Sequence, residues 1–444
     1  MKRKPFALRV SMFALLGIAW NASAQSTSRA VFVVHNGNLE GSVTAFRINS
    51  DASLDFVNRV ITGSRPTSTQ PCSGCNAYEA SLSPSGKYLA TSHPSGTLDG
   101  VTIFEVAADA TITQIFRLEL DTSVGGPLDL VWMSEDLLAV TRLDTTPDRI
   151  AVYAWNPGTP SLSQLGIALN GNGLSYLLVD HEYSTLYANS SSDRTVAAYD
   201  IGAAGGLSLI EAESTGTPFP LELAITPDDA FVYAAGGISN GGDKVMGFSR
   251  QPDGSLDGLP GTPFVSPGAS PSNVFASGDG EYLLVGHGTD ATVRVLDIDT
   301  ATGALTDTGF MFDVGGQGTL GDVAALDDLV FVTDNSTSSD GVRGLYVFKL
   351  GPDGALDQVG PLYDTGGIAP RSIAVWGGLG GLVGDVNCDG VVSVADIGAF
   401  VLALTDPVGY AAQFPDCDIN NADVNDDGMV SVGDIGMFVA LLTN

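Results

Sequence analysis

An internal repeat of about fifty residues restricts the fold of this sequence more than any other feature. An apolar pair opens a short candidate strand seven times, at spacings of 46 to 57 residues, and these pairs begin at Val31, Tyr88, Leu137, Leu186, Val232, Tyr282 and Val330. A second candidate strand follows each pair after a polar loop, and turn sequences such as PDGSL and PDGAL introduce a third. Repeats of this length and pattern are typical of a β-propeller, because one blade cannot bury both of its faces without neighbours.

The innermost strands can be counted separately, and the count closes a ring. The candidate segments are 79–84, 129–134, 175–180, 222–227, 273–278, 322–326 and 372–376. The last segment has no apolar pair after it, whereas the pair at Val31 has no inner strand before it. We therefore expect residues 372–376 to pair beside 31–48, which leaves no open sheet edge. The sequence predicts an all-β fold, a seven-bladed propeller over residues 25–376.

Several turn sequences are similar to those of a known family. SPSGKYLATS, TPDDAFVYAAG, DIDTATGALTDTG and QPDGSLDG resemble segments of the lactonase-type seven-bladed propellers, the group related to 6-phosphogluconolactonase. The resemblance extends over about residues 29–378. It implies a carboxylic ester hydrolase of carbohydrate metabolism, acting on a sugar-type lactone. Two alternatives stay open, because similar propellers also serve as binding surfaces. One is a non-catalytic propeller that binds a carbohydrate or a protein at its pore, and the other is an architectural cell-surface protein.

The candidate active site lies at the centre of the ring. The residues that head the inner strands are expected to point toward the pore, and these are Glu79, Asp129, Ser175, Glu222, Asn273, Asp322 and Ser372. Four carboxylates around one pore repel one another, which raises some of their pKa values or favours a bound cation. A hydrated pore without function is the alternative interpretation.

Three histidines are expected on the same face as this acidic ring, since His35, His93 and His287 each follow the second strand of a blade. A lactonase must deliver water to an ester carbonyl and stabilise the oxyanion that results. A carboxylate or neutral imidazole can act as the base, and an arginine or a bound cation can stabilise the negative charge. The predicted catalytic residues are Glu79, Glu222, His287, His93 and Arg371.

Two loops near the C-terminus follow the ligand spacing of a calcium-binding EF-hand. GDVNCDGVVSVAD (384–396) and ADVNDDGMVSVGD (422–434) carry oxygen donors at alternate positions, and 15 of 21 residues are identical between 385–405 and 423–443. Hard oxygen ligands at this spacing suit Ca²⁺. The sequence predicts two calcium ions, with ligands from Asp385, Asn387, Asp389, Val391, Ser393 and Asp396, and from Asp423, Asn425, Asp427, Met429, Ser431 and Asp434.

The closing residue of each loop is Asp, where an ordinary EF-hand has Glu. One candidate helix follows each loop and none precedes it, so residues 384–444, after a glycine-rich linker at 377–383, resemble the dockerin type I module. The resemblance implies a small α-helical calcium-binding domain that docks onto a cohesin-like receptor. The contact surface would begin at Val394-Ala395 and Val432-Gly433, where many family members have Ser-Thr, so we expect a different partner specificity.

The N-terminus predicts export. Residues 1–24 combine a basic start, a short apolar run and an Ala-Ser-Ala cleavage pattern, which is typical of a signal peptide. A retained anchor is the alternative, but the run is too short to span a membrane. We expect a secreted, periplasmic or cell-surface protein with no membrane span after cleavage. The formal net charge of −32 argues against nucleic acid as a partner. In an oxidising compartment, Cys72 is expected to pair with Cys75, and Cys388 with Cys417.

Overall fold

The computed structural model describes residues 28–37, 40–62, 77–94, 99–120, 126–143, 148–173, 176–216, 218–237, 242–315, 320–335, 344–378, 384–388, 392–414, 417, 419–424 and 430–442. The predicted signal peptide and the Cys72–Cys75 pair lie outside the described residues.

Within these residues, twenty-nine strands form seven antiparallel sheets. Blade 1 consists of β29 (Pro370–Trp376), β1 (Ala30–Gly37), β2 (Glu40–Ile48) and β3 (Leu54–Ile61). Blade 2 consists of β4 (Ala80–Leu82), β5 (Tyr88–His93), β6 (Gly100–Val106) and β7 (Ile112–Glu119). Blade 3 consists of β8 (Leu130–Ser134), β9 (Leu137–Arg142), β10 (Arg149–Asn156) and β11 (Ser161–Leu169). Blade 4 consists of β12 (Leu177–Val179), β13 (Thr185–Ser190), β14 (Thr195–Ile201) and β15 (Leu207–Ser214).

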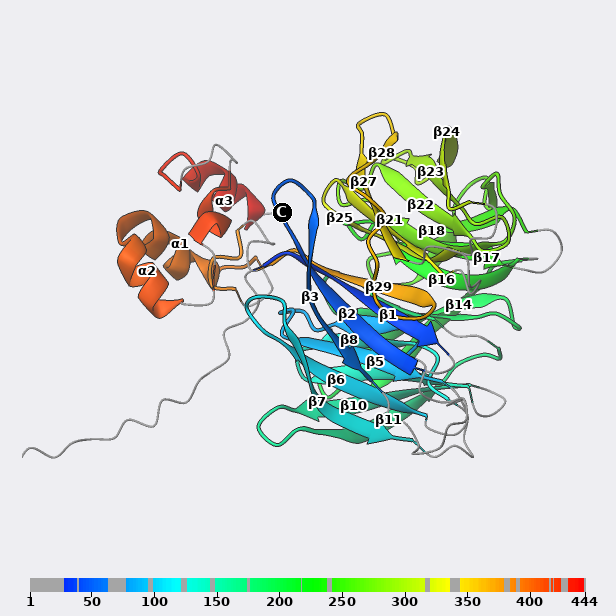
Figure 1. Ribbon diagram of the computed structural model, residues 1–444, viewed down its shortest axis with the longest axis horizontal. Coiled ribbons are helices and arrows are strands. Elements are labelled where there is room, and N and C mark those ends of the chain that lie inside the picture. Colours follow the sequence, from blue (N-terminus) through cyan, green and yellow to red (C-terminus); the bar gives the residue numbers. More distant parts are fainter. Residues whose placement is uncertain are drawn as a thin grey trace, which may run out of the picture.

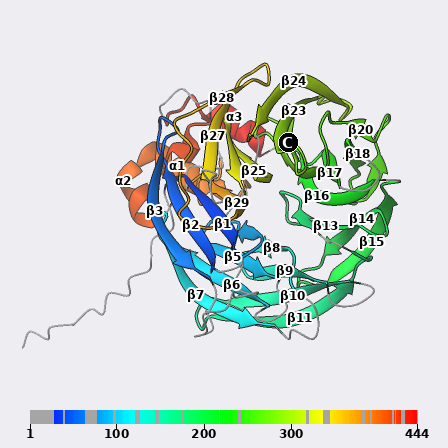
Figure 2. The same ribbon diagram turned by 45° about the vertical axis from the view of Figure 1, so that its right-hand side comes forward.

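The remaining blades follow the same order. Blade 5 consists of β16 (Phe219–Ile225), β17 (Phe231–Gly237), β18 (Lys244–Arg250), β19 (Leu256–Gly258) and a short fifth strand, β20 (Phe264–Val265). Blade 6 consists of β21 (Pro271–Ala276), β22 (Tyr282–His287), β23 (Thr292–Ile298) and β24 (Leu305–Asp313). Blade 7 consists of β25 (Leu320–Leu326), β26 (Leu329–Asp334), β27 (Gly344–Leu350) and β28 (Leu356–Gln358). Figure 2 shows the sheets arranged in a ring.

Blade 1 is built from both ends of the propeller sequence, as predicted. Strand β29 pairs antiparallel with β1, in a register that places Ile373 opposite Val33 and Trp376 opposite Ala30. The pairing closes the ring between blade 7 and blade 1, so the prediction of seven blades is confirmed.

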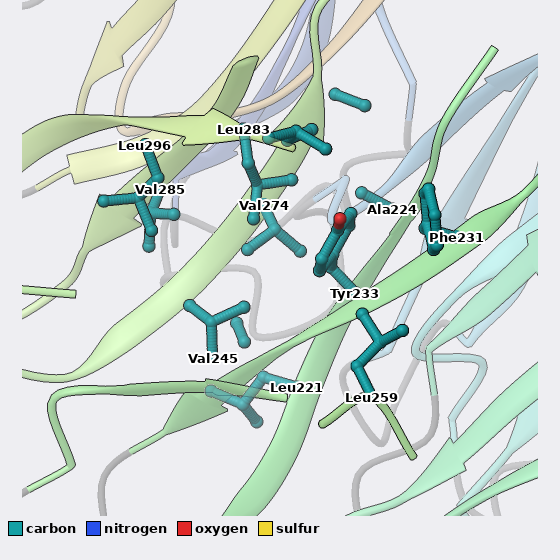
Figure 3. Close-up of a cluster of buried hydrophobic side chains, with 13 residues drawn as sticks. Leu221, Ala224, Phe231, Tyr233, Val245, Leu259, Val274, Leu283, Val285 and Leu296 are labelled. Atoms are coloured by element: carbon teal, nitrogen blue, oxygen red, sulfur yellow. The ribbon is translucent and has the colours of Figure 1, made fainter. Parts of the chain in front are cut away.

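Burial explains the apolar pairs that were recognised in the sequence, because these pairs lie in the strand next to the innermost strand of each blade. Every residue of β5, β13, β17, β22 and β26 is buried, because these strands are covered on both faces by neighbouring blades. The outer strand β7 has one buried residue, and its other residues are partly buried or exposed. Figure 3 shows one interface between blades, where Tyr233 and Val245 of blade 5 pack near Val274, Leu283 and Val285 of blade 6. Stacking of this kind buries the two faces that a single blade would expose.

One glycine in a turn is fixed by both backbone and space. Gly86, in the turn between β4 and β5, has a φ of +68°, a value that side chains with a Cβ rarely adopt. A Cβ on this residue would collide with the ring of Trp376 at the end of β29. Glycine at this position of the SPSGKY turn therefore allows blade 2 to pack closely against Trp376 of blade 1.

The C-terminal segment is helical and lies outside the ring of blades (Figure 1). Its elements are α1 (Asp396–Thr405), α2 (Pro407–Gln413), the 3₁₀ turn η2 (Ile419–Ala422) and α3 (Ile435–Leu441). The predicted helices after the two loops correspond to α1 and α3, whereas α2 was not predicted. The Cys388–Cys417 disulfide is present, with Cα atoms 5.6 Å apart. In the described part of the chain, no helix has the length and apolarity needed to cross a membrane.

Candidate functional site

The heads of the inner strands surround a cavity of about 270 Å³ at the centre of the propeller. Five of the seven predicted pore residues line it, namely Glu79, Asp129, Glu222, Asp322 and Ser372. Asn273 lies next to this lining and donates a hydrogen bond from Nδ2 to Oδ1 of Asp322 at 3.2 Å. Ser175 lies outside the described residues, and the following residue, Tyr176, lines the cavity.

The two aspartates hold neighbouring blades together. Oδ1 of Asp129 accepts a hydrogen bond from the backbone N–H of Leu130 at 2.7 Å, and Oδ2 accepts one from Leu177 of blade 4 at 2.6 Å. Asp322 repeats this pattern, with Val323 at 2.8 Å and Ile373 of blade 1 at 2.9 Å. Both oxygens of each aspartate are therefore used within the backbone of the ring.

The two glutamates are not used in this way. Oε1 of Glu79 lies 3.5 Å from Nη2 of Arg371, which comes from β29. Oε2 of Glu222 is buried, and the described residues provide it with no hydrogen-bond partner. A buried carboxyl oxygen without a partner costs free energy unless a ligand, a proton or water satisfies it. Glu222 is therefore the pore carboxyl group most available for chemistry.

Burial raises the pKa values of all four carboxyl groups, and the charges of neighbouring carboxylates raise those of Asp129, Glu222 and Asp322 further. The pKa of Glu222 is raised well above its ordinary value, first by burial and then by the charges of Asp322 and Glu79. The pKa of Asp129 is also raised well above its usual range. Burial raises the pKa of Asp322 to about 7, and it raises that of Glu79 against the opposing effect of Arg371. These groups can therefore exchange protons at higher pH than exposed carboxyl groups do.

Arg371 lies at the edge of this ring, between two tyrosines and Glu79. Its guanidinium carbon is 3.6 Å from the centre of the Tyr78 ring, and Nη2 lies 3.5 Å from the hydroxyl of Tyr176. The carboxylate of Glu79 and both tyrosine rings favour the charged form of Arg371, and its pKa is raised despite burial. The site therefore contains one fixed cation beside its carboxyl groups.

Both tyrosines were missed by the sequence analysis. Tyr78 directly precedes Glu79, and Tyr176 directly follows Ser175, so each adjoins a residue that was assigned to the pore. The available signal was the aromatic residue beside two of the strand heads. The pKa of Tyr176 is raised well above its ordinary value by burial, so its hydroxyl keeps its proton and can donate a hydrogen bond.

His93 and His287 lie away from the cavity lining. His287 pairs in register with Pro271 at the head of β21, so it lies at the expected end of its blade, but one strand outward from the pore. Its side chain is fully buried, and its Nε2 lies 3.0 Å from Oγ of Ser266. His93 is also fully buried, with Nε2 3.0 Å from Oγ1 of Thr102. Neither imidazole adjoins Glu222 or Arg371 in the described contacts.

His35 occupies the same position in blade 1. It is fully buried, and its Nδ1 lies 3.2 Å from Oγ of Ser42. Burial lowers the pKa of His35 to about 4 and also lowers that of His287. These two histidines are neutral at pH 7, and their contacts are those of packed structural residues.

The first calcium-type loop is closed by a buried carboxylate. Oδ1 of Asp396 accepts a hydrogen bond from the backbone N–H of Asn387 at 2.9 Å, and Oδ2 accepts one from Ser393 at 2.8 Å. Asp434 closes the second loop and accepts a hydrogen bond from the backbone N–H of Ser431 at 2.7 Å. Asp396 and Asp434 are both fully buried.

The described residues do not include every predicted ligand. Asp385 and Asp423 are described, whereas Asp389, Val391, Asn425, Asp427 and Met429 lie outside the described residues. Among the described residues, no group of three or more His, Cys, Asp or Glu side chains comes together as a metal site. The oxygen donors at the first and last loop positions still fit a hard cation, which would offset the cost of burying the charge of Asp385, Asp396 and Asp434, whereas Asp423 is partly buried.

The helices of this segment present the same apolar positions twice. Phe400 of α1 stacks on Phe438 of α3, with ring centroids 3.9 Å apart, so the two repeats share one small core. Outside this core, an apolar face is exposed at matching positions of the two repeats, and it consists of Val394, Ile397 and Val401 in the first repeat and Val432, Ile435 and Val439 in the second. An exposed apolar face that is repeated in this way is typical of an interaction surface.

The comparisons with known proteins agree with this fold. A sequence model of the family described as "Lactonase, 7-bladed beta-propeller" matches residues 166–259, which include β12 to β15 and Glu222. This part of the chain is similar to the lactonase-type propellers. No curated protein matches the sequence.

Three solved structures illustrate the likeness. A periplasmic gluconolactonase from Pseudomonas aeruginosa has 17% identity and a TM-score of 0.60, with 78% of this chain and 99% of that chain covered. A putative 6-phosphogluconolactonase from Bacteroides uniformis has 13% identity and a TM-score of 0.61, with 79% and 100% covered. A functionally unknown protein from Desulfotomaculum acetoxidans has 17% identity and a TM-score of 0.58, with 78% and 98% covered. At these identities the likeness shows the seven-bladed propeller fold alone.

Proposed function

We propose that the propeller hydrolyses sugar-type lactones at its pore. The observation that carries this proposal is Glu222, which combines a raised pKa and an unpartnered carboxyl oxygen with a place in the wall of a cavity. A group of this kind suits general acid–base catalysis, because it exchanges its proton at higher pH than an exposed carboxyl group does. The lactonase-type fold supports the choice of substrate class.

The proposed reaction begins with water in the cavity. Ionised Glu222 takes a proton from the water while the water oxygen forms a bond to the lactone carbonyl carbon. Arg371 and the hydroxyl of Tyr176 stabilise the negative charge on the carbonyl oxygen. The ring C–O bond then breaks, and Glu222 returns the proton to the departing ring oxygen. The product is the open-chain hydroxy acid, and Glu79 orients Arg371 throughout.

The proposal is tested by a panel of lactones with the full chain, followed by titration of the acid released. We expect turnover of at least one sugar lactone above the spontaneous rate. If none of the panel is hydrolysed and a sugar or a protein binds at the pore instead, the protein is a non-catalytic binding propeller. If the pore also binds no ligand, the architectural interpretation is favoured.

We further propose that residues 384–444 bind two calcium ions and dock onto a cohesin-like receptor. The closing residues Asp396 and Asp434 support the metal assignment, since they are fully buried, and a bound cation would offset the cost of burying their charge in addition to their backbone hydrogen bonds. Asp385 and Asp423 would share in holding this cation. The matching apolar faces of α1 and α3 support docking through this segment. Export through the signal peptide at 1–24 completes the proposal, which describes a secreted, periplasmic or cell-surface protein.

A further inference from the structure

We propose that the pore selects uncharged lactones and rejects lactones that carry a phosphate or carboxylate group. This inference rests on the proposed lactonase activity and adds a substrate class to it. The geometry that carries it is a small cavity with carboxyl groups at one level and hydrocarbon at the next.

The charge of the cavity wall opposes anions. Among the described residues that line the cavity, four carry carboxyl groups and none is a lysine or an arginine. A phosphate monoester brings a charge of about −1.5 to −2 at pH 7. No positive side chain of the described lining compensates this charge, and a buried anion without a counter-charge is costly because water screens charges poorly there. The raised pKa values of Glu222 and Asp322 show that the site already resists the negative charge of its own groups.

The cation beside the cavity already has its partners. The guanidinium of Arg371 lies over the Tyr78 ring and faces the carboxylate of Glu79, which balances its charge. A phosphate would have to compete with Glu79 for this arginine, and Glu79 would then be left without its counter-charge. An uncharged carbonyl oxygen needs no such exchange, because it accepts a hydrogen bond without displacing the carboxylate.

The second level of the cavity is apolar. Val131, Leu178 and Phe275 line it, and Val131 and Phe275 each lie two residues beyond a strand head, so these two point to the same side as the polar ring. A sugar lactone presents hydroxyl groups at its rim and C–H groups on its faces. The hydroxyl groups can exchange hydrogen bonds with the carboxyl ring, while a face of the sugar contacts the hydrocarbon. The volume of about 270 Å³ is sufficient for a single sugar ring.

The test compares binding of two stable analogues by the full chain. The probes are D-glucono-1,5-lactam and its 6-phosphate, which resist hydrolysis, titrated by calorimetry at pH 7. We expect the uncharged lactam to bind at least tenfold more tightly. Equal affinity, tighter binding of the phosphate, or no binding of the uncharged lactam would overturn the inference.

Turnover of the two parent lactones separates this inference from the proposed function. If the uncharged lactam binds more tightly but neither lactone is hydrolysed, the proposed activity is wrong and the charge selection stands as a binding property. If both lactones are hydrolysed and the phosphorylated one is preferred, the activity stands and the inference is wrong.

A matched pair of variants tests the electrostatic cause. Ser81 lines the cavity, and Ser81→Lys would add a cation, whereas Ser81→Gln would add a neutral side chain of comparable length. We expect the ratio of the affinities for the uncharged lactam and its 6-phosphate to fall at least threefold in the lysine variant. In the glutamine variant, this ratio should stay the same as in the parent. Circular dichroism confirms that both variants are folded. An equal change in the two variants would show that cavity size, not charge, sets the preference, which contradicts the proposed cause.

Discussion

One methylene group separates the two kinds of carboxyl group in the pore. The shorter Asp129 and Asp322 accept hydrogen bonds from backbone N–H groups of the adjoining blade. Their oxygens are therefore already bonded within the fold. The longer Glu79 and Glu222 are not used in this way, and one faces Arg371 while the other keeps an unpartnered oxygen. Side-chain length therefore separates the carboxyl groups that join neighbouring blades from those that remain available in the pore.

The raised pKa of Glu222 predicts the pH dependence of catalysis. A general base must be ionised, so kcat/KM should rise with pH through a midpoint well above the ordinary Glu value of 4.5. The Glu79→Gln variant removes one of the charges that raise this pKa, so its midpoint should lie at lower pH. Initial rates on an uncharged lactone between pH 4 and 8 measure both. A midpoint near 4.5 in the parent, or the same midpoint in both proteins, would contradict this role of Glu222.

The buried His35 predicts a loss of stability in acid. Its folded pKa of about 4 lies below the ordinary value of 6.5, so the unfolded state binds this proton first as the pH falls. Stability should decrease from about pH 6.5 and level off below about pH 4, by about 3 kcal/mol. The raised carboxyl pKa values act in the opposite direction over a similar range, because the folded state binds those protons first.

The His35→Gln variant isolates the histidine contribution, since it leaves the carboxyl groups unchanged. Urea unfolding at pH 7 and pH 4.5 should show the parent losing more stability than the variant by about 2 kcal/mol. Parallel losses in the two proteins would show that His35 does not carry the effect.

The sequence predicted the position of the strand-head carboxylates at the pore, but it did not predict the burial of the histidines between blades. The strand heads follow from repeat position alone, and an inner strand has no neighbouring strand between it and the pore. His93 and His287 lie at the predicted end of their blades. They belong to β5 and β22, however, and every residue of these two strands is buried between blades. Position along a strand was therefore readable, whereas burial of an entire strand could only be known from the stacking of its neighbours.

At the scale of the elements, β29 is the strand that closes the ring of blades. It is the inner strand of blade 1, although it lies at the far end of the propeller sequence, and Asp322 of blade 7 bonds to its Ile373 N–H. This strand therefore joins the last blade to the first by pairing on one side and by a side-chain hydrogen bond on the other.

Removal of the Asp322 side chain should weaken this closure. Asp322→Ala leaves the N–H groups of Val323 and Ile373 without their acceptor, which should cost about 2–4 kcal/mol of unfolding free energy. Asp322→Asn keeps one carbonyl oxygen and should cost about half as much. Urea unfolding at pH 7 measures both. Equal stability of the alanine variant and the parent would show that the side chain does not contribute to closure.

Helix α2 shows which element signals were overlooked. Asp406 caps this helix by accepting a hydrogen bond from the N–H of Gly409 at 3.0 Å, and Pro407 occupies its first position. An aspartate followed by a proline is a recognised start signal for a helix. The prediction relied on the repeat of the two calcium-type loops, and this repeat includes the helices that follow each loop but not the residues between the two repeats, where α2 lies.

At the scale of the whole molecule, the propeller and the C-terminal segment should respond differently to calcium. The segment buries a small core around Phe400 and Phe438, whereas the blades bury seven extensive interfaces. A calcium ion at 100 times its dissociation constant adds about 2.7 kcal/mol to the stability of a site. The Cys388–Cys417 disulfide adds roughly 2–4 kcal/mol. Metal and disulfide together should decide whether this small domain is folded.

Chelation should therefore melt residues 384–444 and leave the propeller folded. Calorimetry of the full chain should show a small transition that moves to lower temperature with chelator and a large one that does not. The double variant Asp385→Ala with Asp423→Ala should lose this response, and any docking should disappear with the small transition. A chelator effect confined to the large transition, or no effect at all, would contradict the metal assignment.

The central claim is that chemistry takes place in the pore, at Glu222, and not at the buried histidines. The most direct test is kcat/KM on an uncharged sugar lactone for Glu222→Gln and His287→Gln, each corrected for its folded fraction. Both changes remove one titratable side chain, but only Glu222 lines the cavity. We expect Glu222→Gln to lose about 100-fold or more and His287→Gln to stay within about threefold of the parent. An equal loss in both variants, or a loss confined to His287→Gln, would contradict the account.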